Sequence, residues 1–368
     1  MTTEENQRIR SLIPLVPLNA DADADLATVE TITNSVANED TLVVYFMSKR
    51  IAAAWVREPG KQLALVKLTD DVDSLIEEIN TYSNKVRASI SGWQEAGVRL
   101  HAKIIAPLGP LKGKRIIIVP SLMMERIPFD ALGTSDTQTL PAGAQIVILS
   151  NLMPTSIVRL TEYVDAKPVV IGINGEGLSR AVSEAKEIAK SLGVEPITGG
   201  SARIDTVGPL LSHAPIVHLA THATLDMANP FASRIEMSDP LKPIAGWWLF
   251  SQPMNAKLIT LSACQTAEGS IGKGEIFPSG IYNSPSFAEI FHQVGVRFVV
   301  GTMWSVDDAL ASVLMIRFYE KLKKTDGDPS AALSDAKRAV INEGKANAAQ
   351  LAAFQISVRS LADLHLPQ

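Results

Sequence analysis

Two residues of this chain have the types that nucleophilic catalysis needs, and each lies at the end of an apolar run. Cys264, the only cysteine in 368 residues, ends the stretch "AKLITLSAC". His222 lies near the end of "PIVHLATHA". An imidazole beside a thiol can take its proton and generate the thiolate, which is the attacking species in cysteine hydrolases. If the two runs are neighbouring strands of one sheet, Cys264 and His222 are expected to meet at its edge.

Both residues also have an ordinary structural interpretation, since a lone cysteine is usually a small buried hydrophobe. His218 precedes His222 by four strand residues, about 13 Å, so the two histidines cannot share a metal ion. We therefore expect His218 to be structural and hydrogen-bonded within the strand layer. The remaining histidines are scattered and are expected at the surface or on helices; they are His101, His213, His292 and His365.

The composition excludes several classes of protein. Hydrophobic residues make up 46% and charged residues 20% of the chain, which is ordinary for a globular protein, and the net charge of -5 gives no reason to expect nucleic-acid binding. A single cysteine excludes a disulfide framework and a multi-cysteine zinc site. No metal or cofactor is expected. The acidic N-terminus lacks a secretory layout, and no apolar run is long enough to span a membrane. These features predict a cytoplasmic location.

The elements that would position the pair follow an alternating rhythm. Strands are predicted around Ser48 and Lys49, over 61–69 and over 114–120, with helical spacing over 70–106. After Pro154 strands alternate with helices, which predicts an α/β fold with a mostly parallel sheet covered on both faces. These later strands are 167–174, 215–223, 256–264 and 297–305, and the helices are 177–193, 286–296, 307–324, Pro329 to about Glu343 and Ala348 to about Leu361.

Several long motifs resemble those of the CHAT family of caspase-like cysteine peptidases, which is related to separase. They include "LHAKIIAPLGPLKGKRIIIVPSLMMERIPFDAL", "VHLATHA", "LITLSACQTAEGSIGKGE" and "SFAEIFHQVGVRFVVGTMWSVDDALASVLMIRFYEKL", in order between about residues 40 and 341. The resemblance implies a caspase-hemoglobinase-like three-layer sandwich with a mostly parallel central sheet. It divides the chain into a polar lead-in (1–38), a degenerate caspase-like half (39–160) and a catalytic domain (161–368).

By the same resemblance, His222 and Cys264 would be the catalytic dyad. The backbone N–H groups of Ala223 and Cys264 would form the oxyanion hole. Asp307 and Asp308 would line an acidic pocket for a basic substrate residue, although an Asp at a helix start is also a common N-cap. Trp304 would be a wall of that pocket or, alternatively, part of the core.

The resemblance implies a cytoplasmic endopeptidase that cuts a specific protein partner, under control of an activator or operon partner, in a bacterial defence or cell-death setting. One departure from the family is the insert "IFPSGIYNSPS" (276–286), whose composition is typical of a loop close behind Cys264. Together with Ala223, where relatives often have Gly, the insert leaves open an inactive, peptidase-like interaction module. A hydrolase acting on a small ester or amide is a third alternative.

Overall fold

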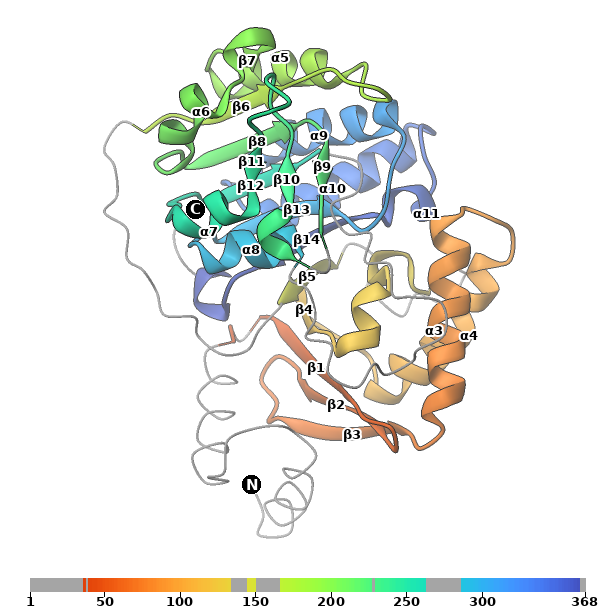
Figure 1. The fold of residues 1–368 in the computed structure, drawn as a ribbon. Coiled ribbons are helices and arrows are strands. Elements are labelled where there is room, and N and C mark those ends of the chain that lie inside the picture. The colour runs from red at the N-terminus through yellow and green to blue at the C-terminus, as the bar shows by residue number, and fades with distance from the viewer. Residues whose placement is uncertain are drawn as a thin grey trace. The chain divides into compact units, whose positions relative to one another are not determined.

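The chain divides into two compact units, Met1–Leu152 with Leu364–Leu366, and Met153–Asp363 with Pro367–Gln368. The computed structural model describes residues 36–37, 39–133, 144–149, 166–226, 229–262 and 286–364 (Figure 1). The predicted lead-in lies almost entirely outside these residues. The domain bounds 39–160 and 161–368, and the degenerate caspase-like character of the first half, stay predictions. In the described part of the chain, no helix has the length and apolarity to cross a membrane.

The described residues of the first unit form a mixed sheet and two α-helices. Strand order is β3-β2-β1-β4-β5, in which β1 pairs antiparallel with β2 and parallel with β4. The predicted helical stretch 70–106 is two helices, because Ser89 and Gly92 adopt positive φ between them. The elements are β1 (Thr41–Met47), β2 (Ala52–Arg57), β3 (Ala64–Thr69), α3 (Val72–Arg87), α4 (Trp93–Ile104), β4 (Arg115–Val119) and β5 (Gln145–Leu149).

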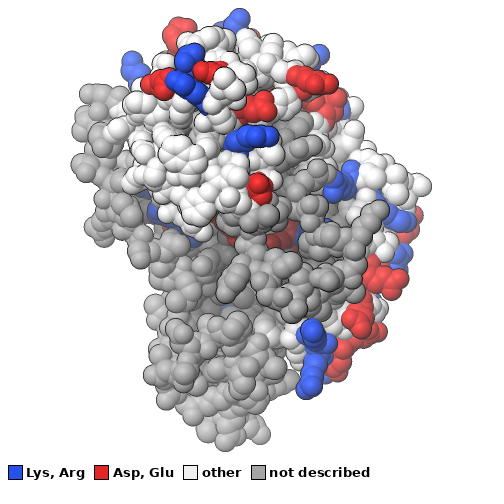
Figure 2. Space-filling model, viewed as in Figure 1, with Lys and Arg blue, Asp and Glu red and all other residues white. Residues whose placement is uncertain are grey.

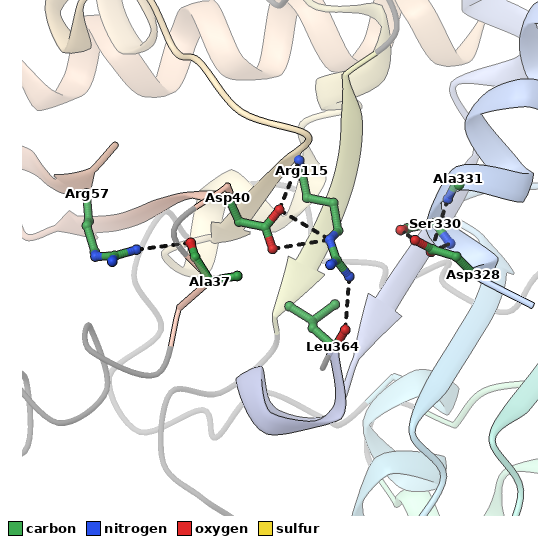
Figure 3. A network of polar contacts seen from close by, with 8 residues as sticks. All are labelled: Ala37, Asp40, Arg57, Arg115, Asp328, Ser330, Ala331 and Leu364. Atoms are coloured by element: carbon green, nitrogen blue, oxygen red, sulfur yellow. Dashed lines mark hydrogen bonds and ion pairs between the residues drawn. The ribbon is translucent and has the colours of Figure 1, made fainter. Parts of the chain in front are cut away.

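A buried ion pair lies at the start of β1 and β4. The Asp40 carboxylate contacts Nε of Arg115 at 3.2 Å, and Nη1 of Arg115 donates to the carbonyl of Leu364 (Figure 3). Burial raises the pKa of Asp40, while Arg115 opposes the rise. Removing one partner of such a pair leaves an uncompensated buried charge. Through Arg115, the ion pair also connects Leu364 to the strands of the first unit.

In the described residues of the second unit, six strands form a mostly parallel sheet in the order β14-β13-β12-β8-β6-β7, and β14 runs antiparallel to its neighbour β13. Short strands β9, β10 and β11 form a separate small sheet beside α7 (Figure 1). The strands are β6 (Val169–Gly172), β7 (Ile197–Thr198), β8 (Ile216–Ala220), β9 (Ala223–Thr224), β10 (Arg234–Ile235), β11 (Ile244–Ala245), β12 (Leu258–Leu261), β13 (Phe298–Thr302) and β14 (Phe354–Val358).

Helices cover both faces of this sheet, as the alternation predicts. Odd-numbered strand residues such as Val217 and Ile259 pack in one core cluster with residues of α6, α7 and α8. Even-numbered residues face α5 and α9, because strand side chains alternate between faces. The helices are α5 (Ala181–Leu192), α6 (Ile204–Leu211), α7 (Gly246–Ser251), α8 (Phe287–Gln293), α9 (Asp308–Leu322), α10 (Pro329–Asn342) and α11 (Ala348–Leu351). The second unit is thus a three-layer α/β sandwich.

One helix prediction is wrong. The segment from Ala348 to Leu361 was expected to be helical, but α11 ends at Leu351 and is followed by β14. The sequence "FQISV" of β14 is rich in β-branched and aromatic residues, and β14 pairs antiparallel with β13 over five residue pairs. Pairing with the edge of the parallel sheet outweighs the helical spacing of the preceding residues.

His292, on α8, is buried and bridges that helix to β14. Its Nδ1 lies 2.9 Å from the carbonyl of Val296 and its Nε2 lies 2.8 Å from Oγ of Ser357. Burial lowers the pKa of His292 to about 4, and the nearby Arg359 also lowers it. The ring therefore stays neutral in the folded state at pH values where it is charged in the unfolded chain.

We expect His292 to make folding pH-dependent. The contribution of the buried, neutral ring to the free energy of unfolding is fully present above the unfolded pKa of about 6.5 and is lost as pH falls towards 4. The loss between pH 7 and pH 5 amounts to about 2 kcal/mol. His292→Gln, which does not titrate, should flatten this part of the curve. Urea unfolding of both proteins at several pH values measures the difference, and parallel curves would contradict the assignment.

Acidic and basic side chains are interspersed on the face shown in Figure 2. An example in the second unit is the cluster in which Arg203 contacts Asp205 and Asp239, and Lys242 contacts Asp205. The cluster is largely solvent-exposed, and exposed pairs of this kind contribute little to stability.

Candidate active site

The chain reverses its direction of travel across the sheet at β6 and β8. From β6 it crosses through α5 to β7 on one side, and then returns to β8 on the other side of β6. The connections that leave β6 and β8 therefore diverge beyond the carboxyl ends of these strands. In open α/β sheets this position forms the ligand-binding crevice. His222 lies two residues after β8 and so stands at this point.

The loop after β6 holds the ring of His222. Nε2 of His222 lies 2.8 Å from the carbonyl oxygen of Glu176. Glu176 and Gly177 form the turn between Gly175 and Leu178, whose backbone groups bond to each other at 3.1 and 3.2 Å. Gly177 has a φ of +72°, which favours glycine. The imidazole is thus oriented by a backbone acceptor at the switch point.

This contact decides how the His222 ring is protonated. Because a carbonyl oxygen only accepts, Nε2 must carry the proton and donate it to Glu176. Nδ1 is then the basic nitrogen of the neutral ring. The hydrogen bond to Glu176 fixes this tautomer, in which Nδ1 is the nitrogen that can accept a proton.

Hydrogen bonds join the segment around Glu176 to the first residues of α5 and α9. The Asn174 side chain accepts from the Val182 N–H at 2.9 Å. The Asp308 carboxylate accepts from the Arg180 N–H at 2.8 Å and from Oγ of Ser179 at 3.3 Å. The helix termini of α5 and α9 are therefore joined directly beside the turn that positions His222.

The two aspartates predicted to line the pocket have different hydrogen-bond partners. The Asp307 carboxylate caps α9 by accepting from the Leu310 N–H at 3.0 Å, as the N-cap interpretation expects. Asp308 binds Ser179 and Arg180 and is half-buried. Trp304 is 8% exposed. Asp308 is therefore the member of this predicted set that contacts the segment following the His222 loop.

Ala223 presents its backbone N–H away from the small sheet. The Glu236 N–H donates to the carbonyl of His222 at 2.8 Å, which makes the opposing Ala223 and Ile235 a non-hydrogen-bonded pair of the antiparallel ladder. The N–H of Ala223 thus does not bind β10. Ala223 is in extended conformation in β9 and is not among the described residues with positive φ, so an alanine is accommodated there without strain.

Cys264 lies outside the described residues, as does the insert apart from Ser286, which caps α8. The strand that leads to Cys264 is described. β12 is the parallel neighbour of β8, with Thr260 opposite His218 and Leu261 opposite Leu219. The Ser262 N–H continues this ladder by donating to Leu219 at 2.9 Å. The two apolar runs are neighbouring strands, which is the condition that the sequence analysis set for Cys264 and His222 to meet at one edge.

Sequence reasoning missed the turn that binds His222. The contributing atom is a backbone carbonyl of Glu176, which any residue type would supply. The only available signal was the "INGEGL" stretch directly after an apolar strand, where two glycines surround one acidic residue.

The solved structures that match this chain have little sequence in common with it. Two structures of the Saccharomyces cerevisiae separase–securin complex match with TM-scores of 0.56 and 0.55, each at 11% identity, covering 90% and 92% of this chain. The chain spans 31% of the matched chain in both cases. A complex of Porphyromonas gingivalis RgpB pro- and mature domains matches with a TM-score of 0.43 at 10% identity, covering 78% of this chain and 75% of that one. The fold is thus a mixed α/β fold similar to that in the separase complex.

A search of curated protein sequences finds no match. The family model for the CHAT domain matches residues 94–359, which is most of the chain. The match includes His222, Cys264 and every strand of the second unit, and it begins within the first unit. On this match, together with the separase-like fold, the chain belongs to the CHAT domain family.

Proposed function

We propose that the protein is a cysteine endopeptidase whose nucleophile is Cys264 and whose general base is His222. The observation that supports this most directly is the register of β8 and β12. His218 pairs with Thr260, 42 residues further along the chain, and Cys264 follows His222 by the same number of residues. Parallel strands rise at the same rate, so equal spacing beyond their ends favours equal height.

In the proposed reaction, Nδ1 of His222 takes the thiol proton of Cys264 while Glu176 holds Nε2–H. The thiolate attacks the scissile carbonyl carbon, and the N–H groups of Ala223 and Cys264 stabilise the oxyanion. His222 then donates its proton to the leaving amine, which releases the first product and leaves an acyl-enzyme. A water molecule, deprotonated by the same imidazole, hydrolyses the thioester and restores the thiol.

The proposed substrate is a specific protein cut after a basic residue, because the Asp308 carboxylate lies at the segment that follows the His222 loop. A protein partner is proposed to control the activity. The separase neighbour was solved in complex with securin, which supports this part by analogy of fold alone. A bacterial defence or cell-death role rests on family resemblance.

Fluorogenic peptides with Arg, Lys, Asp or Leu before the reporter group test the proposal. The wild-type protein is expected to turn over the Arg and Lys peptides, and Cys264→Ala should abolish the turnover while leaving the melting temperature unchanged. Turnover that persists in Cys264→Ala would refute the dyad. Failure to cut any peptide or any protein of the source proteome would favour the alternative, an inactive interaction module.

Gly175 offers a test of how closely the loop packs on His222. A Cβ at this position would lie 3.0 Å from both Cδ2 and Nε2 of the ring. Gly175→Ala should displace the imidazole by a few tenths of an ångström and lower kcat by about tenfold. Gly200→Ala is the matched control, because a Cβ there meets no atom within 4 Å. Equal kcat values for the two variants would show that the ring tolerates the displacement.

The proposed substrate pocket leads to a separate prediction. Asp308→Asn should lower kcat/KM for the Arg peptide by about tenfold, since it removes a charge that faces a basic substrate residue. Asp307→Ala should instead lower stability by about 1 kcal/mol, because it removes an N-cap. Steady-state kinetics and urea unfolding of both variants separate the two roles. A loss of stability without a change of peptide preference in Asp308→Asn would assign that residue to structure alone.

A further inference from the structure

Four polar side chains form a continuous buried chain under the candidate site. Nδ1 of His218 lies 2.6 Å from Oγ1 of Thr260, which lies 2.7 Å from the hydroxyl of Tyr319. On the other side of the ring, Nε2 of His218 lies 3.1 Å from Oε1 of Glu184, in ion-pair range although not aligned as a hydrogen bond. All four residues are at most 1% exposed. Burial of polar groups at this depth is costly unless they are partnered.

The four residues come from four different elements: α5 (Glu184), β8 (His218), β12 (Thr260) and α9 (Tyr319). The Tyr319 ring also packs edge-on against His218, with centroids 5.5 Å apart. Burial raises the pKa of Tyr319, so its hydroxyl keeps its proton and can donate to Thr260. The chain thus joins the two strands that lead to His222 and Cys264 with the two helices that anchor the His222 loop.

Apolar packing alone does not fix the register of these strands. β8 is "IVHLA" and β12 is "LITL", and side chains repeat every two residues, so a slip of two residues would keep apolar side chains on each face. The His218–Thr260 pair has no such freedom. Any slip would separate it and leave buried polar groups without partners, which costs more than the net gain from an ordinary hydrogen bond.

We propose that Glu184, His218, Thr260 and Tyr319 are positioning residues, which set the register of β8 and β12 and thereby bring His222 and Cys264 to the same height. This inference rests on the proposed function and adds to it the origin of the dyad's geometry. The four residues act through the strands and touch no substrate.

The test uses the single cysteine of the full-length chain as its probe. The rate of Cys264 alkylation by iodoacetamide, followed by intact mass across a pH series, reports the thiol's titration and needs no substrate. Thr260→Val and Tyr319→Phe remove one hydroxyl each at nearly constant shape, and Thr260→Ser returns the hydroxyl. Tyr82→Phe is the matched control, because its buried hydroxyl donates to the Pro128 carbonyl at 3.2 Å in the other unit.

Thr260→Val and Tyr319→Phe are expected to raise the midpoint of alkylation by about one pH unit, towards an ordinary thiol. They should also lower kcat on a cleaved peptide by about tenfold with little change in KM. Thr260→Ser should restore both values, and Tyr82→Phe should lower the melting temperature without moving the midpoint.

Two outcomes would overturn the inference, and they are distinguishable. If Thr260→Val and Tyr319→Phe titrate as the wild type does while wild type and His222→Ala differ, the dyad stands and the positioning role is refuted. If wild type and His222→Ala have the same midpoint, no dyad exists, and the proposed function is refuted together with the positioning role.

Discussion

Replacing His222 with alanine is expected to lower kcat for peptide cleavage by about a thousandfold, within the range that general acid–base catalysis contributes. The reason is the orientation of the ring. Nε2 donates a hydrogen bond to the Glu176 carbonyl at 2.8 Å, so in the proposed dyad Nδ1 is the nitrogen that accepts the thiol proton. Without the imidazole, the thiol of Cys264 should titrate near its ordinary pKa of about 8.5. When alkylation rates are measured from pH 5 to 10, the midpoint of the curve should then lie at a higher pH than in wild type.

His213→Ala serves as the control for this experiment, because His213 lies just beyond the end of α6 and is distant in sequence from the loop after β6. It should leave both kcat and the alkylation curve unchanged. A His222→Ala protein that retains wild-type kcat would remove His222 from the mechanism. Loss of kcat with an unchanged alkylation curve would mean that His222 does not activate the thiol, and would refute the proposed dyad.

Gly172→Ala is expected to destabilise the protein by about 3 kcal/mol, at the upper end of overpacking effects. Gly172 is the last residue of β6, and α5 packs directly on it. A Cβ at this position would lie 2.5 Å from the carbonyl oxygen of Ala181 and 2.5 Å from Cβ of Ala185. The first is a backbone atom of α5 and the second is bonded directly to that backbone, so neither can move away by a side-chain rotation. Relief therefore requires the helix to shift away from the strand.

Urea unfolding measures this cost as a shift of the midpoint at constant m value. The control is again Gly200→Ala, which should stay within about 0.5 kcal/mol of wild type because nothing opposes the added methyl. The same free energy for both variants would mean that α5 yields without cost. A shift of α5 would also move Glu184, so Gly172→Ala should lower activity even in the folded fraction.

Sequence patterns were sufficient where the signal is local. The apolar runs that became β8 and β12 are continuous and β-rich, and Asp307 stands directly before an amphipathic stretch, so strands and an N-cap could be assigned from neighbouring residues alone. The segment after Ala348 was misassigned as a helix because its state is set by pairing with β13, which the local pattern does not contain.

By itself, the sequence determined the α/β class, the family and the two residues with the chemistry of a cysteine hydrolase, because residue types and periodicity are properties of the chain. Only the tertiary structure decided that β8 and β12 are paired with Thr260 opposite His218, that a carbonyl of Glu176 orients His222, and that Asp308 binds the segment after that loop. Strand order, register and backbone hydrogen bonds arise between residues that are distant along the chain. They depend on packing geometry, which residue types constrain only in part.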